Sequence, residues 1–225
     1  MGDTARRGDA PGEMGDSLPA VDLGTGRTAI AMTAGYEHTC ALLDNGSVKC
    51  WGDSPFGELG RGDRVARGDG PGEMGNALSP VDLGTGRTAV AVEAGGGHTC
   101  ALLDNGTAKC WGNNTFGQLG LDDTSDRGDE PGEMGDVLTA VDLGTGHKAV
   151  QMTAGTFYTC SLLNTGTVKC WGDNRYGQLG LGNRTPQGAR PGDMGDALLV
   201  VDLGGVQVAV VRPHKAVLPV LSRDR

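Results

Sequence analysis

The chain has few of the residues that mark several common protein classes. Aromatic residues make up only 4% of its 225 residues, and 19 Lys and Arg are outnumbered by 28 Asp and Glu, for a net charge of −9. No run approaches the roughly 18 consecutive apolar residues of a transmembrane helix, and the first residues include no apolar core of a signal peptide. Because basic residues are scarce, direct nucleic-acid binding is disfavoured. We therefore expect neither a membrane span nor a nucleic-acid partner.

Glycine, by contrast, is abundant, at 41 of 225 residues, whereas about 7% is usual. The glycines lack the three-residue period of collagen. Most of them recur at a fixed spacing of 60 residues, and the same spacing separates Trp51, Trp111 and Trp171. Glycine at fixed places indicates tight turns in an ordered fold, since only glycine readily adopts a positive φ.

The 60-residue spacing divides the chain into repeats. We expect unit 1 at residues 1–60, unit 2 at 61–120, unit 3 at 121–180, a partial fourth unit at 181–204 and a divergent tail at 205–225. The chain begins and ends abruptly relative to this register. We interpret it as a piece of a longer repeat array, and a natural capping tail is the alternative.

Each unit has the pattern of short strands joined by glycine-rich turns. In unit 1 we expect strands at Leu18–Leu23, Thr28–Met32, His38–Leu43 and Ser47–Trp51. No segment shows the 3.6-residue apolar period of a helix. Four short strands per tandem unit describe the blade of a β-propeller. We therefore predict an all-β fold with three full blades of about four antiparallel strands and a partial fourth, that is, an incomplete, open propeller.

Large aromatic residues recur at two positions of every unit. Because a blade is stable only when its neighbours cover it, we expect these residues to pack between blades, and a ligand cage is the alternative interpretation. The positions are Trp51, Phe56, Trp111, Phe116, Trp171 and Tyr176.

A family resemblance rests on the segment 95–120, which reads GGGHTCALLDNGTAKCWGNNTFGQLG. This segment is similar to the regulator of chromosome condensation repeat, in a bacterial-type version that contains cysteines. The resemblance covers most of the chain and implies a β-propeller, which has seven blades in that family. Unit 1 departs from the motif at 53–58, which reads Asp-Ser-Pro-Phe-Gly-Glu and replaces the Asn and the Gln, and unit 3 departs at Tyr158, which replaces a His.

Two cysteines flank a turn in every unit. If the Asp44–Gly46 loop has three residues with Gly46 left-handed, Cys40 faces Cys50 at about 4.5–5.5 Å, within disulfide range. A two-residue turn would instead place Cys40 opposite Trp51. Zinc ligands and buried free thiols are the alternatives, although the spacing is unlike that of most zinc sites. The candidate disulfide residues are Cys40, Cys50, Cys100, Cys110, Cys160 and Cys170.

No catalytic, cofactor-binding or metal-binding motif is visible, and the acidic loops match no established calcium loop. We therefore predict a non-enzymatic protein-interaction scaffold without a cofactor, whose partner carries a basic patch. The resemblance implies two alternatives, a guanine-nucleotide exchange factor for a small GTPase and a secreted enzyme inhibitor. Bonded cysteines would indicate an extracytoplasmic or secreted location, and a cytoplasmic location is the alternative.

Overall fold

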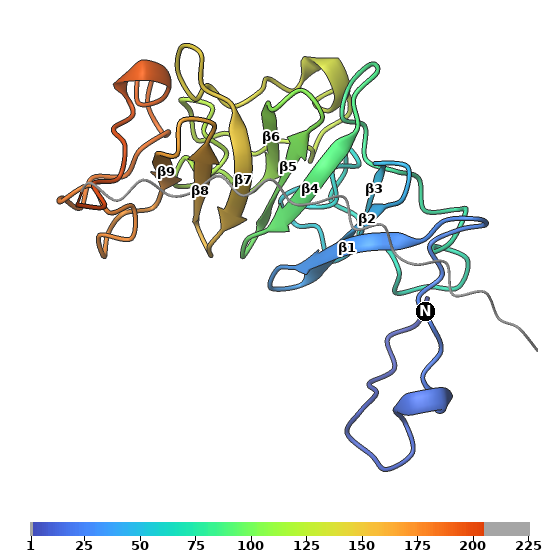
Figure 1. Cartoon of the computed structure of the whole chain (residues 1–225). Helices are drawn as coiled ribbons and strands as arrows, with labels where there is room; N and C mark the ends of the chain where they lie inside the picture. The colour runs from blue at the N-terminus through green and yellow to red at the C-terminus, as the bar shows by residue number, and fades with distance from the viewer. Residues whose placement is uncertain (1, 205–225) are drawn as a thin grey trace, which may run out of the picture.

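The computed structural model describes residues 2–204, so the predicted divergent tail at 205–225 lies outside the described residues. Three antiparallel sheets of three strands each stand side by side in an open row (Figure 1). The sheets are β1 (Ala29–Ala34), β2 (His38–Leu43) and β3 (Val48–Gly52); β4 (Ala89–Ala94), β5 (His98–Leu103) and β6 (Ala108–Gly112); and β7 (Ala149–Ala154), β8 (Tyr158–Leu163) and β9 (Val168–Gly172). Single 3₁₀ turns lie in the long loops, η1 (Gly15–Ser17), η2 (Gly135–Val137) and η3 (Gly195–Ala197). The prediction of an all-β, incomplete propeller is confirmed.

The predicted fourth strand is the one correction to the blade. The segment Leu18–Leu23 is irregular, and each sheet has three strands. The equivalent segment of unit 2 lies beside the sheet of unit 1, where the Val81 amide donates to the Val48 carbonyl at 2.8 Å. Pro80 has no amide to extend this pairing into a ladder. The segment 18–23 has no preceding sheet among the described residues to pair with.

The hairpin between the second and third strands sets the register of each sheet. The Leu43 amide donates to the Ser47 carbonyl at 2.9 Å, and Gly46 has a φ of 78°. The loop therefore has three residues with glycine in the left-handed region, and Cys40 lies opposite Cys50. The same register recurs in the other two sheets.

Two apolar cores fill the spaces between neighbouring units. One lies between units 1 and 2 and includes Val48, Leu59 and Trp111; the other lies between units 2 and 3 and includes Leu119 and Trp171. A core therefore forms only where two units meet, as the repeat pattern requires.

Candidate interaction site

All six cysteines form disulfides across the hairpins. The pairs are Cys40–Cys50, Cys100–Cys110 and Cys160–Cys170, with Cα atoms 4.0–4.1 Å apart. Counting back from the hydrogen-bonded Leu43–Ser47 pair places each disulfide at a non-hydrogen-bonded position, where facing Cα atoms approach most closely. Each hairpin is therefore closed covalently.

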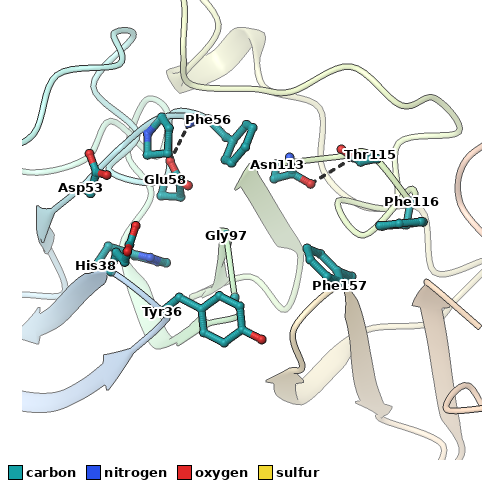
Figure 2. Close-up of a pocket in the computed structure, with 13 residues that line it drawn as sticks. Tyr36, His38, Asp53, Phe56, Glu58, Gly97, Asn113, Thr115, Phe116 and Phe157 are labelled. Atoms are coloured by element: carbon teal, nitrogen blue, oxygen red, sulfur yellow. Dashed lines mark hydrogen bonds between the residues drawn. The ribbon is translucent and has the colours of Figure 1, made fainter.

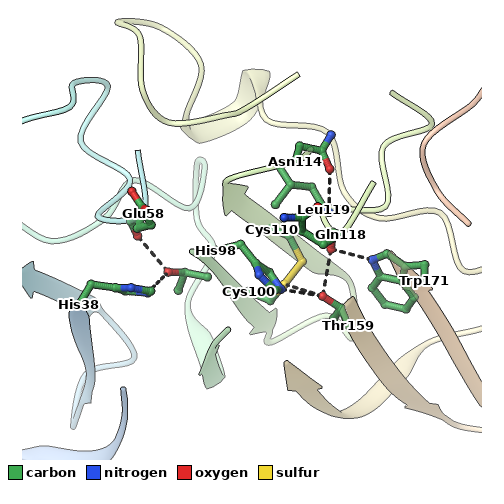
Figure 3. The surroundings of a disulfide bond; sticks show 11 residues. His38, Glu58, His98, Cys100, Cys110, Asn114, Gln118, Leu119, Thr159 and Trp171 are labelled. Atoms are coloured by element: carbon green, nitrogen blue, oxygen red, sulfur yellow. Dashed lines mark hydrogen bonds between the residues drawn. A yellow bond between two sulfur atoms is a disulfide. The ribbon is translucent and has the colours of Figure 1, made fainter. Parts of the chain in front are cut away.

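Polar side chains join the units by a repeated hydrogen-bond pattern (Figure 3). His98 Nε2 lies 2.9 Å from Thr159 Oγ1, which donates to the Gln118 carbonyl at 2.9 Å; the Trp171 indole donates to the same carbonyl at 3.0 Å. Because the threonine uses its hydrogen on that carbonyl, His98 must donate from Nε2. Burial lowers the pKa of His98 to about 3, so the ring is neutral. The same pattern joins units 1 and 2 through His38, Thr99, Glu58 and Trp111.

The residues predicted to pack between blades lie in different environments. Trp111 and Trp171 are fully buried, Trp51 and Phe116 are half-buried, and Phe56 and Tyr176 are 39% and 86% exposed. The exposure of Phe56, Phe116 and Tyr176 depends on which residue of the following unit covers each ring.

The ring of Phe116 lies 5.2 Å from that of Phe157, which covers it from unit 3. Gly97 holds the equivalent place for Phe56 and gives less cover. The equivalent place for Tyr176 is residue 217, outside the described residues. Tyr176 therefore does not pack between blades within the part that the structure describes.

A cavity of about 620 Å³ lies at the junction of units 1 and 2 (Figure 2). We call this cavity the junction pocket. Its aromatic lining comes from Tyr36, Phe56, Phe116 and Phe157, and its carboxylates are Glu37, Asp53 and Glu58. No lysine or arginine lines it. Residues 96 and 97 are both glycine, whereas unit 3 carries Thr156 and Phe157 at these positions, and the missing side chains leave the space.

Glu58 is the titratable group at the base of the junction pocket. Its side chain is buried, at 4% exposure, and Oε2 accepts from the Phe56 amide at 2.8 Å. Burial raises the pKa of Glu58 to about 7, and Asp53 and Asp126 raise it further by repulsion. In unit 2 the equivalent Gln118 donates to Asn113 at 2.7 Å. Unit 1 thus replaces a donor–acceptor pair by two carboxylates.

The junction between units 2 and 3 holds a cation at the corresponding place. The guanidinium carbon of Arg175 lies 4.4 Å from the centre of the Phe116 ring, and its Nε donates to Asp173 at 3.0 Å. The counterpart of Arg175 in unit 2 is Thr115. The counterpart of Asp173 is Asn113, so the first junction lacks both the guanidinium and its carboxylate partner, and its carboxylates Glu37, Asp53 and Glu58 come from unit 1.

The acidic loops form closed turns. Glu73 Oε2 accepts from the amides of Gly68 and Gly70, both at 2.9 Å, and Glu133 repeats this arrangement. These carboxylates accept hydrogen bonds from backbone amides of their own loops. Residues 2–204 hold no group of three or more His, Cys, Asp or Glu side chains arranged for a metal ion, and none of their helices is long and apolar enough to cross a membrane.

Sequence reasoning missed the junction pocket. Two signals were present: the replacements at Asp53 and Glu58, and the glycine run at 95–97. Neither shows that Phe56 and Gly97, in different units, face each other. That proximity becomes visible only when adjacent blades are placed side by side.

Comparisons with known proteins agree with the repeat organisation. Two models described as "Regulator of chromosome condensation (RCC1) repeat" match the chain, one at residues 29–58, 89–118 and 149–178 and the other at 45–102 and 105–162. The human "Probable E3 ubiquitin-protein ligase HERC4" is 32% identical over 67% of this chain and 13% of its own length. The "Ultraviolet-B receptor UVR8" of Arabidopsis thaliana is 31% identical over 75% of this chain and 34% of its own.

Solved structures show the same fold at lower identity. The structure titled "Crystal structure of Kap60 bound to yeast RCC1 (Prp20)" gives a TM-score of 0.57 at 20% identity, covering 83% of this chain and 39% of that one. A Saccharomyces cerevisiae Prp20p structure gives a TM-score of 0.54 at 18% identity, over 70% and 36%. The chain thus spans between 13% and 39% of the length of these four proteins.

Proposed function

We propose that this chain, which belongs to the regulator of chromosome condensation (RCC1) repeat family, is a non-enzymatic module that binds a protein partner. The observation that carries the proposal is where the units differ. The hairpins, disulfides and junction tryptophans repeat from unit to unit, whereas the residues around the junction pocket change. Positions 36–37, 96–97 and 156–157 read Tyr-Glu, Gly-Gly and Thr-Phe. A rigid framework with a variable rim is typical of recognition surfaces.

The charge of the chain indicates the kind of partner. The net charge of −9 and the carboxylates of the junction pocket favour a partner with a basic patch. Of the two yeast structures, one is described as bound to Kap60 and the other by its binding properties to Gsp1p and histones. Those statements concern the yeast proteins, and they support protein binding as a use of this fold.

The three disulfides support an oxidising compartment for this chain, because cytosolic thiols are kept reduced. The enzyme-inhibitor alternative is compatible with such a location and is a special case of protein binding. The exchange-factor alternative has a direct assay, release of labelled nucleotide from a panel of small GTPases. We expect no acceleration by this chain, and acceleration of any panel member would favour that alternative.

Binding to an array of diverse peptides tests the proposal. The oxidised chain is expected to bind peptides rich in Lys and Arg, with affinity that falls steeply as salt is added. The control is the same chain reduced, alkylated and unfolded, which exposes the same charges without the fold. Equal binding by folded and unfolded chain, or no binding to any peptide, would contradict the proposal.

A further inference from the structure

We propose that the junction pocket binds the arginine side chain of a partner polypeptide, an assignment that rests on the proposed function and makes it more specific. The occupant is inferred from the chain itself, because the next junction along carries a guanidinium in the corresponding place. Arg175 lies over the Phe116 ring and is held by Asp173. This pairing shows that a guanidinium fits over the ring at this point of the repeat. In the first junction the counterpart of Asp173 is Asn113, and the carboxylate nearest the ring is Glu58 of unit 1.

The first junction provides the same two kinds of group around an open space. Phe56 occupies the position of Phe116, and its ring is 39% exposed. A Cβ atom placed on Gly97 would lie 3.5 Å from Glu58 Oε1 and 3.8 Å from Phe56 Cδ2. The carboxylate and the ring therefore border the space above Gly97 together (Figure 2). A guanidinium there would contact both, as Arg175 contacts both of its partners.

Charge favours a cation in this pocket over any other occupant. Glu37, Asp53 and Glu58 line it, and the one histidine in the lining, His38, is neutral because burial lowers its pKa to about 4. Arginine fits better than lysine because its planar guanidinium stacks on an aromatic face and donates to a carboxylate at the same time. Free arginine carries a carboxylate that these acidic groups would repel, so the structure favours an arginine within a polypeptide.

A titration with acetyl-arginine amide near pH 8, where Glu58 is ionised, tests the assignment when it is followed by amide chemical shifts of the oxidised chain. The probe represents an arginine in a peptide, and acetyl-citrulline amide has nearly the same shape without the charge. We expect shifts centred on Gly96, Gly97 and Phe56, with at least about tenfold weaker binding for citrulline. Equal affinity for the two probes, or arginine shifts located elsewhere, would overturn the proposal.

Two variants test the pocket in different ways, one by filling its space and the other by removing its charge. Gly97→Phe copies Phe157 into the empty place, and Gly97 lacks a positive φ, so its backbone accepts a side chain. Glu58→Gln copies Gln118 and removes the charge while keeping the shape. Each is expected to weaken arginine binding by about tenfold or more. Asp16→Asn, which removes an exposed charge from η1, is the matched control and should leave the affinity unchanged.

The outcomes separate this assignment from the proposed function. Unchanged arginine affinity in Glu58→Gln and in a folded Gly97→Phe chain would exclude the junction pocket, while peptide-array binding by the oxidised chain would still support a binding module. Loss of affinity in both variants but not in Asp16→Asn would establish the pocket. If Gly97→Phe fails to fold, Glu58→Gln alone decides the charge requirement.

Discussion

Glu58 is a residue that lowers the stability of the fold at neutral pH. Its burial raises the pKa to about 7 from an ordinary value of 4.5, so folding favours the protonated form. A raised folded pKa contributes stability that is fully present below the unfolded pKa and is lost as the pH rises through the folded one. The ionised side chain therefore costs free energy above about pH 7, as residues at binding sites often do.

Glu58→Gln is consequently expected to stabilise the protein in alkaline solution. The neutral amide can donate to Asp53, as Gln118 donates to Asn113. A shift from 4.5 to about 7 corresponds to a gain on the order of 3 kcal/mol near pH 8 and little gain near pH 4. Urea unfolding at both pH values measures the difference. The reverse change, Gln118→Glu, should destabilise the second junction with the same pH dependence, and a gain independent of pH would contradict the argument.

His38 and His98 produce the opposite pH dependence. Burial lowers their pKa values to about 4 and about 3, from an ordinary value of 6.5, so the folded chain keeps both rings neutral. A lowered folded pKa gives stability that is present above the unfolded pKa and is lost as the pH falls toward the folded one. We expect each histidine to cost on the order of 3 kcal/mol between about pH 6.5 and pH 4.

Urea unfolding of Glu58→Gln with and without His38→Gln isolates this contribution, because Glu58 no longer titrates. The His38→Gln chain should be less stable near pH 7, since its bond to Thr99 is altered, and should lose less stability on acidification. Equal losses in the two chains would contradict a neutral, buried His38.

At the scale of the elements, the disulfides differ in accessibility. Cys100 and Cys110 are fully buried between two neighbouring sheets, whereas Cys160 is half-buried in β8. We expect reductant to open Cys160–Cys170 first in the native protein. Alkylation followed by peptide mass mapping reports the order. Complete reduction in denaturant should add two hydrogens per disulfide to the intact mass, and alkylation of the native chain without reductant would show that the cysteines are free.

Each hairpin disulfide also stabilises the fold by restricting the unfolded chain. For loops with a sequence separation of 10, the expected contribution is about 2–3 kcal/mol. Cys100→Ala with Cys110→Ala should lower the free energy of unfolding by about that amount, because the unfolded chain is then no longer restricted by the closed loop. The matching pair Cys160→Ala and Cys170→Ala is the control for position. Comparable losses from both pairs would support the entropic explanation.

The elements that sequence predicted well are those fixed by local chemistry. The strand His38–Leu43 has the predicted bounds, because the glycine before it and the Asp-Asn-Gly turn after it set both ends. Local sequence leaves two hairpin registers open, because glycine at a positive φ suits both; the hydrogen bond from the Leu43 amide to the Ser47 carbonyl decides for the three-residue loop. The segment Leu18–Leu23 has strand-like residues, but pairing depends on a neighbouring unit. The junction pocket likewise depends on contacts between units, which no local pattern encodes.

At the scale of the whole molecule, stability depends on neighbours. Val92 and Met152, at equivalent positions of β4 and β7, are 5% and 3% exposed, whereas their counterpart Met32 in β1 is 68% exposed. The difference comes from the preceding sheet, which covers β4 and β7 and is absent before β1 among residues 2–204 (Figure 1). In a repeat protein of this kind the free energy is the sum of unit terms and interface terms, so a unit with two interfaces is the most stable.

Hydrogen exchange should therefore be slowest in the central sheet. Every residue of β5 and β6 is buried, β8 alternates between buried and half-buried residues, and β1 is mostly exposed. Exchange from the native state proceeds by local opening, which costs more where two interfaces must separate. We expect deuterium uptake to be slowest in β5 and β6, faster in β8 and β9, and fastest in β1. Trp111→Phe, which removes the indole bond to the Glu58 carbonyl, should speed exchange in unit 1 more than in unit 3. Uniform uptake across the sheets would instead indicate that the three units unfold as one cooperative block.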